Sequence, residues 1–181
     1  MEWDHGKEAK KSSSTAIKML ERLLTAGFDK DISLGLINST ISLNCKEDMF
    51  STIDIGIIDL VKGNIEFIKN GAAPSYIKHR RQVEIIKSLS LPAGILDNVD
   101  LVVYDKDVSD GDIIVMCSDG IIESNTEYNN KEVCLRDVLE NIETDNVQKI
   151  ADMIISEAID NDYGIAKDDM TVYVIKVNEI K

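Results

Sequence analysis

Two aspartates at the ends of apolar segments are the residues of this sequence best suited to chemistry. Asp119 comes shortly after the apolar run 113–117, and Gly120 follows it. Asp168 lies just before a second apolar segment, 170–177. A carboxylate offers hard oxygen ligands, and glycine lets a ligand or backbone come close because it has no Cβ. The pattern is compatible with a cation site, although Asp-Gly is also an ordinary turn sequence.

Two strands are expected to position these aspartates. The run 113–117, IIVMC, is short, β-branched and bounded by turn residues, which predicts a strand buried on both faces. Residues 170–177 form the last predicted strand. If the two strands are antiparallel neighbours, the end of the first lies beside the start of the second, and Asp119 meets Asp168. Carboxylates without histidine or thiolate favour Mg²⁺ or Mn²⁺; the alternative is two solvated turns.

The preceding part of the chain shows two other periodicities. Residues 12–27 predict a core-facing helix that ends at Gly27, and Asp29 is expected to cap a second helix. The apolar stripe of that second helix comprises Ile32, Leu36, Ile37 and Ile41. Alternating residues then predict strands, with turns between them, at 51–60, 65–67, 75–78, 83–86 and 99–104.

The strand at 99–104 is expected to pair with the central strand 113–117 across the turn at 109–111. Residues 131–140 predict a weak helix and 145–159 a clear one, with Asp145 and Gln148 as a capping box. Strands occur in consecutive runs and helices are segregated. The sequence therefore predicts an α+β fold with mainly antiparallel sheet.

Composition excludes several classes of function. The 181 residues include 33 acidic and 20 basic side chains, a net charge of −13 that repels nucleic acid. Three separated cysteines, without a C-x-x-C pair, are typical of reduced thiols in the cytoplasm. We expect no membrane span, because no apolar run approaches the roughly 18 residues required. No glycine-rich nucleotide motif is present.

Six segments, taken in order, resemble the PPM family of metal-dependent serine/threonine phosphatases, the type-2C class. The resemblance extends from Gly6 to Val177, and its most specific part is the SDG sequence followed by DDMTV. The matching segments are 6–29, 47–60, 70–78, 91–96, 111–123 and 167–177.

The resemblance implies an αββα four-layer sandwich with two Mn²⁺ or Mg²⁺ ions at one edge. Asp119 and Asp168 match the family's metal ligands, while Gly120 and Asp169 would support those ligands without binding an ion. A metal-bridging water would attack the phosphate of a phosphoserine protein. The implied substrate is an anti-sigma-factor antagonist, whose dephosphorylation activates a sporulation sigma factor.

One family feature is missing from this sequence. Relatives carry a metal-bridging aspartate in an Asp-Gly-Met-Gly segment just before the position of Gly6, and residues 1–5, MEWDH, do not reproduce it. Asp4 is a poor substitute, three positions away. We therefore expect residues 1–5 to be a tail and 6–181 to be one partial phosphatase domain that lacks its N-terminal strands. Alone, this partial domain should bind metal weakly and have little or no activity. A membrane anchor upstream in the parent protein is compatible with the sequence.

Other interpretations remain at this point. His79 is interpreted as a solvated loop histidine, and Lys78, Arg80 and Arg81 as either a solvated turn or a contact for an acidic or phosphorylated partner. Instead of an enzyme, the domain could be a phosphatase-like binding module without chemistry. A third hypothesis is a homodimer, or pairing between sheet edges of two chains.

Overall fold

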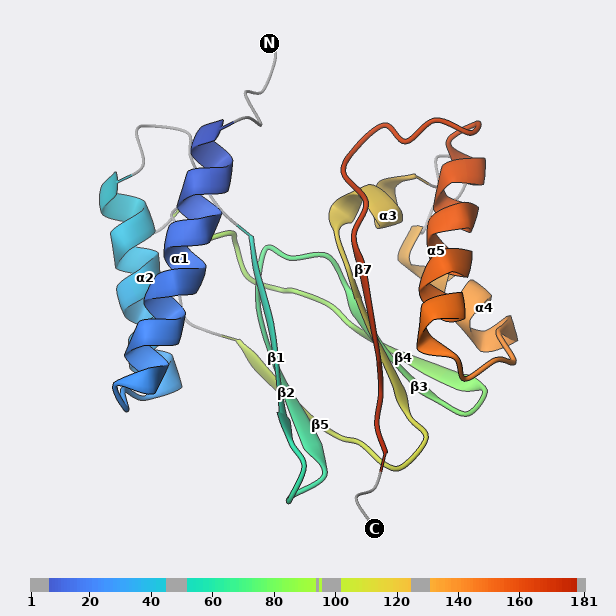
Figure 1. Ribbon diagram of the computed structural model, residues 1–181, viewed down its shortest axis with the longest axis horizontal. Helices are drawn as coiled ribbons and strands as arrows, with labels where there is room; N and C mark the ends of the chain where they lie inside the picture. The colour runs from blue at the N-terminus through green and yellow to red at the C-terminus, as the bar shows by residue number, and fades with distance from the viewer. Residues whose placement is uncertain (1–6, 45–51, 94, 96–101, 125–130, 179–181) are drawn as a thin grey trace. The chain divides into compact units, whose positions relative to one another are not determined.

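The computed structural model describes residues 7–44, 52–93, 95, 102–124 and 131–178 (Figure 1). The predicted tail, Cys45 and Gly94 lie outside these residues. The chain forms two compact units, which we call the hairpin unit (Met1–Ile53, Lys69–Gly71 and Leu89–Val102) and the sheet unit (Asp54–Ile68, Ala72–Ser88 and Val103–Lys181). No helix within the described ranges is both long and apolar enough to cross a membrane.

The hairpin unit contains the two predicted helices, α1 (Lys7–Thr25) and α2 (Lys30–Asn44). Gly27 adopts a φ of 85°, and the next residue, Phe28, donates its N–H to Leu23 O at 3.0 Å. This is the left-handed helix end that glycine favours. Asp29 Oδ1 accepts the N–H of Asp31 at 2.8 Å, so the predicted cap of α2 is confirmed.

The predicted apolar faces of the two helices are partly wrong. Ile32 and Leu36 are 56% and 42% exposed, whereas Leu34 and Ile37 are buried. Apolar residues occur at both 32/36 and 34/37, so the spacing allowed two faces. Of the predicted stripe members whose side chains are described, Ile37 alone is buried, and the side chain of Ile41 lies outside the described part. On α1, Ile17 is exposed rather than facing a core.

Two antiparallel sheets form the centre of the sheet unit. The first has the strand order β1 (Ile53–Asp59), β2 (Asn64–Asn70), β5 (Val103–Asp107). The second has the order β4 (Gln82–Ile86), β3 (Ser75–His79), β6 (Ile113–Cys117), β7 (Val172–Lys176). A shared apolar cluster joins the two sheets, and its buried members are Ile65, Phe67, Ile77, Ile86, Val108 and Ile114.

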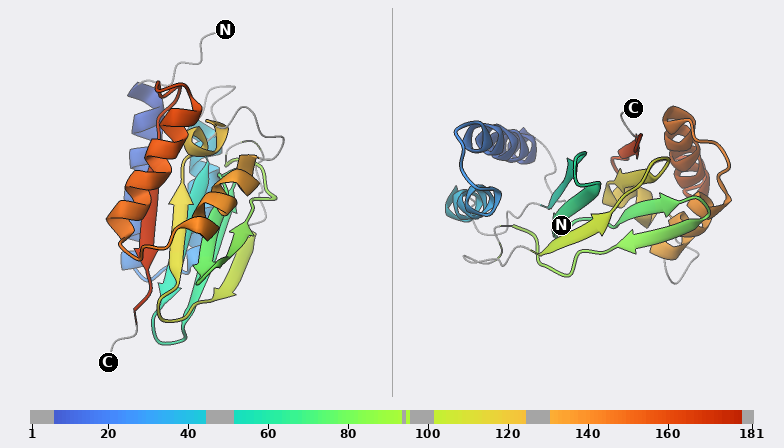
Figure 2. Two further views of the ribbon diagram at one scale, coloured as in Figure 1. Left: turned by 90° about the vertical axis from the view of Figure 1, so that its right-hand side faces the viewer. Right: turned by 90° about the horizontal axis from the view of Figure 1, so that it is seen from below.

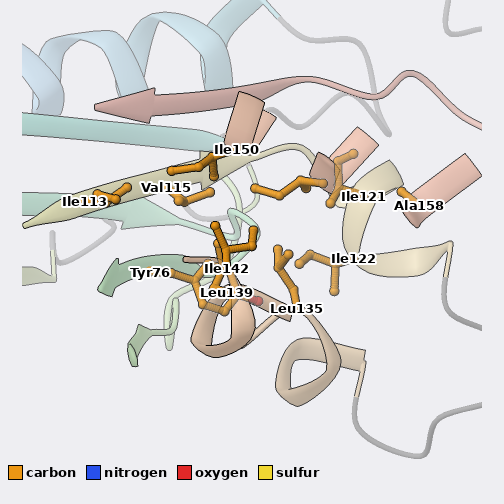
Figure 3. Close-up of a cluster of buried hydrophobic side chains, with 11 residues drawn as sticks. Tyr76, Ile113, Val115, Ile121, Ile122, Leu135, Leu139, Ile142, Ile150 and Ala158 are labelled. Atoms are coloured by element: carbon orange, nitrogen blue, oxygen red, sulfur yellow. The ribbon is translucent and has the colours of Figure 1, made fainter. Parts of the chain in front are cut away.

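Helices cover the other face of the second sheet, as Figure 2 shows for α4 (Lys131–Asn141) and α5 (Val147–Asn161). Figure 3 shows side chains of β6 and of these helices packed in one apolar cluster. Ile114 belongs to the cluster between the sheets and Val115 to the helix-covered cluster. The prediction that β6 is buried on both faces is therefore confirmed, as is the α+β fold with antiparallel sheets.

The predicted pairing between residues 99–104 and the central strand is wrong. The strand β5 pairs with β2, with Tyr104 opposite Phe67, and residues 99–101 lie outside the described part. The neighbours of β6 are β3 and β7, which leaves no free edge for β5. The turn before β6 instead joins β7: Gly111 donates its N–H to Val177 O at 2.9 Å. The connection therefore passes from one sheet to the other.

The predicted capping box of α5 is also wrong. Asn146 is the N-cap, and its Oδ1 accepts the N–H of Lys149 at 3.0 Å. Asp145 instead contacts Lys176 Nζ on β7 at 2.6 Å, and this hydrogen bond lowers the pKa of Asp145. The side chain of Gln148 donates to Asp152 Oδ1 at 2.9 Å rather than reaching back to the cap.

Candidate metal centre

The pairing of β6 with β7 brings the two acidic segments together. The strands are antiparallel, with Cys117 at the end of β6 opposite Val172 at the start of β7. One residue further, Ser118 donates its N–H to Thr171 O at 3.0 Å. The predicted arrangement, in which the end of one strand lies beside the start of the other, is confirmed.

The hydroxyl of Ser118 adds two further contacts between these segments. It accepts the N–H of Thr171 at 3.0 Å and donates to Asp169 O at 3.0 Å. Three hydrogen bonds thus connect Ser118, which precedes Asp119, to Asp169 and Thr171, which follow Asp168. They fix the backbone that carries both aspartates, because each bond restrains the loop against the end of β6.

Gly120 provides the space for this close approach. A Cβ at this position would lie 2.6 Å from Asp169 O and 3.4 Å from the Cβ of Asp168. The first distance is too short for any side chain unless the backbone of the loop moves. Gly120 is therefore required by contact with the acidic loop, as its place beside Asp119 suggested.

Both carboxylates are exposed and have oxygen atoms available. Asp119, the first residue of α3 (Asp119–Glu123), accepts the N–H of Gly120 at 3.1 Å through Oδ1. Asp168 Oδ1 accepts the N–H of Asp169 at 2.7 Å. Within the described part of the chain, neither carboxylate forms an ion pair with a basic side chain. Both carboxylates therefore offer oxygen atoms to solvent near the paired ends of β6 and β7.

The chemistry of these donors fits a hard divalent cation. Carboxylate oxygens are the ligands that Mg²⁺ and Mn²⁺ prefer. Across the described residues, however, no group of three or more histidine, cysteine, aspartate or glutamate side chains is placed to hold a metal ion. Asp119 and Asp168 therefore fit part of a ligand set.

Comparison with known proteins identifies the family. A family model described as stage II sporulation protein E matches residues 3–178. The chain belongs to the stage II sporulation protein E family. The protein of that name from Bacillus subtilis (strain 168) is 35% identical over 174 residues, which are 96% of this chain and 21% of the relative. The chain thus spans about a fifth of the length of this curated member of the family.

Two solved structures from Bacillus subtilis resemble the chain closely. One contains the PP2C phosphatase domain and a fragment of the regulatory domain of the cell fate determinant SpoIIE; it is 35% identical with a TM-score of 0.84, covering 92% of this chain and 50% of that chain. The other is the Mn-presoaked SpoIIE phosphatase domain, 33% identical with a TM-score of 0.71, covering 92% and 74%. The resemblance to type-2C phosphatases is therefore confirmed.

Two residues near the end of β6 that precedes Asp119 were not predicted from the sequence. Ser118 was treated only as a turn residue, although its hydroxyl joins the two acidic segments. Asp54 on β1 accepts a hydrogen bond through Oδ2 from Ser75 Oγ at 3.3 Å. Ser75 in turn is opposite Met116 on β6. The alternation in β1 gave no signal for Asp54, because it places the isoleucines 53, 55 and 57 on one face and Asp54 on the other.

The predicted basic cluster lies at the other end of β6. Lys78 is opposite Ile113, the first residue of β6, whereas Asp119 follows the last. His79 is partly exposed, and its Nδ1 is 2.8 Å from Asp112 Oδ2. The histidine thus has a specific partner and is not simply a solvated loop residue. The structure does not bring these basic residues to the candidate metal centre.

Proposed function

We propose that this chain is part of a metal-dependent protein serine/threonine phosphatase. The observation that carries the proposal is the antiparallel pairing of β6 with β7, which places Asp119 beside the loop of Asp168. Membership of the SpoIIE family supports it, because a solved relative with 35% identity contains a PP2C phosphatase domain. We further propose that residues 6–181 belong to one catalytic domain.

In this proposal, Asp119 and Asp168 hold Mn²⁺ or Mg²⁺ through their exposed oxygens. The bound ion would supply an activated water and neutralise charge on a phosphoryl group. Ser118 and Gly120 determine where the two carboxylates lie, since the first ties the loop to β6 and the second leaves room for it. Asp169 contributes its backbone carbonyl to this arrangement and does not bind the ion.

The substrate we propose is a phosphoserine on a small anti-sigma-factor antagonist, so that hydrolysis activates a sporulation sigma factor. Support comes from the sporulation family to which the chain belongs. The contribution of the described residues is two carboxylates, fewer than a two-ion site requires. We therefore expect weak Mn²⁺ binding and little turnover unless a further carboxylate is supplied.

The test is Mn²⁺-dependent hydrolysis of a phosphoserine protein. Turnover is measured for the chain alone and for the chain joined at its N-terminus to the Asp-Gly-Met-Gly segment that relatives carry. We expect activity in the joined protein, and its loss in Asp119→Asn without unfolding. Asp107→Asn is the matched control, because this exposed aspartate ends β5, and 108–112 connect it to the opposite end of β6.

Two results would contradict the proposal. Unchanged turnover in Asp119→Asn would remove this residue from the mechanism. A joined protein that is folded and binds the phosphoserine substrate, but does not hydrolyse it, would instead support a phosphatase-like binding module.

A further inference from the structure

A cavity of about 490 Å³ lies at the end of β6 opposite the candidate metal centre. We call it the basic pocket. One wall is the β3–β4 hairpin with Lys78, Arg80 and Arg81. The other is residues 140–145, which comprise the end of α4 and part of its connection to α5. Ile113, the first residue of β6, lines the cavity, and Cys117, the last residue, lies near Asp119. The two positions are four residues apart along the strand, or roughly 13 Å.

Lys78 is a buried residue that lines this cavity. Its side chain lies on the helix-covered face of the second sheet, and only 6% of the residue is exposed. Its Nζ donates to Leu139 O, in the last turn of α4, at 2.5 Å. An ammonium group has three donors, so this carbonyl leaves capacity for another acceptor. Burial lowers the pKa of Lys78, the cost that a nearby anion would offset.

Arg80 adopts a backbone conformation that is unfavourable for arginine. Its φ is 58°, at the first position of the two-residue turn between β3 and β4. Hairpin turns of this kind prefer glycine or asparagine there, because other residues adopt a positive φ only at an energetic cost. Such a cost, kept where a guanidinium lines a cavity, points to a role for the side chain.

The carboxylates around the basic pocket already contact basic side chains. These pairs are Glu140–Arg136 at 3.8 Å, Glu143–Arg81 at 3.7 Å and Asp145–Lys176 at 2.6 Å. Lys78 and Arg80, by contrast, have no ion pair with a carboxylate in the described ranges of the chain. Lys78 and Arg80 are therefore the two cations of the basic pocket without a carboxylate in direct contact among the described residues, although the charge of Glu140 partly opposes the lowering of the Lys78 pKa by burial.

We infer that the basic pocket binds a phosphoryl dianion, either free phosphate or a phosphorylated side chain. Guanidinium offers several donors in a planar fork and ammonium a point charge, the usual pair of groups for this ligand. The net charge of −13 does not prevent binding, since at physiological salt charges are screened beyond about 8 Å. The inference is independent of the proposed phosphatase activity.

The test is an NMR titration of the full chain in the presence of EDTA, which removes any contribution from metal at the other end of β6. The probes are inorganic phosphate, a phosphoserine peptide and the same peptide without phosphate. We expect saturable shifts at the amides of the basic pocket. Shifts with free phosphate alone identify that source, and shifts with the phosphopeptide identify a phosphorylated side chain.

The variant Arg80→Gly separates binding from folding. Glycine relieves the positive φ, so the variant should be at least as stable as the parent, while phosphate affinity falls about tenfold or more. Lys78→Met, which keeps the apolar stem, should weaken binding similarly, and Lys149→Gln on the exposed surface of α5 should not. No saturable shift at the basic pocket, or equal affinity in Arg80→Gly, would overturn the inference.

Discussion

At the scale of single residues, the geometry of the candidate metal centre depends on the lack of a side chain at Gly120. The location of Asp119 and Asp168 at the paired ends of two strands was predictable from sequence, because each residue adjoins a strand-like apolar run. The reason for Gly120 was only half predictable. The Asp-Gly pair suggested close approach of some group, but only the structure shows that this group is the backbone of Asp169.

We predict that Gly120→Ala destabilises the protein and displaces the acidic loop. The added Cβ meets Asp169 O at 2.6 Å, and such overpacking typically costs about 1–3 kcal/mol of unfolding free energy. Urea denaturation measures the loss. Gly35→Ala in α2 is the control: nothing lies within 4 Å of its Cβ position, so helix propensity should stabilise it by about 0.5–1 kcal/mol. Equal stability of both variants would contradict this account of Gly120.

Ser118→Ala should loosen the same loop without removing a carboxylate. The variant loses the hydroxyl bonds to Thr171 and Asp169, worth about 1 kcal/mol each. We expect faster hydrogen exchange at the Thr171 amide, measured by NMR. Ser156→Ala, at an exposed position on α5, should leave that exchange rate unchanged. An unchanged rate in Ser118→Ala would show that the hydroxyl does not restrain the loop.

At the scale of elements, the presence of a strand or helix was easier to predict than the element with which it pairs. The run 113–117 predicted β6 because only a doubly buried strand tolerates consecutive apolar residues. Its pairing with 99–104 was predicted wrongly, since strand pairing depends on which sheet each strand joins. Similarly, Asp145 and Asn146 are both good helix caps, and the contact of Asp145 with Lys176 on β7 decides between them.

Lys176→Met should raise the pKa of Asp145. The hydrogen bond to Lys176 lowers this pKa in the folded protein below its ordinary value. The pair therefore stabilises the folded protein at pH values above the ordinary pKa of aspartate. This contribution is lost as the pH falls through the lowered pKa of Asp145. NMR titration of the Asp145 carboxyl group checks this. Identical titration curves in the parent and the variant would show that Lys176 has no such effect.

At the scale of the whole molecule, family membership was predictable and the division into units was not. Six motifs in order indicated the phosphatase family, because they combine residue type with sequence order. The two compact units include separated segments, such as Lys69–Gly71 with the hairpin unit, and no local pattern predicts such grouping. The contribution of Asp54 likewise depends on packing between sheets.

The two units should differ in local stability. Ile17 of α1 is 67% exposed, whereas Ile77 of β3 and Ile114 of β6 are fully buried. We predict that amides of α1 and α2 exchange at lower denaturant concentration than those of β3 and β6, because fewer buried contacts oppose their opening. Native-state hydrogen exchange measures this. One common exchange class for both units would contradict it.

The central claim is that Asp119 and Asp168 hold the same cation, and a double-mutant cycle of Mn²⁺ affinity tests it most directly. Affinity is measured by electron paramagnetic resonance for the parent, Asp119→Asn, Asp168→Asn and the double variant. We predict that each single change weakens binding about tenfold or more, and that the double variant is weaker by less than the product of the two effects. Parent-like affinity in either single variant, or fully independent effects, would contradict a shared ion.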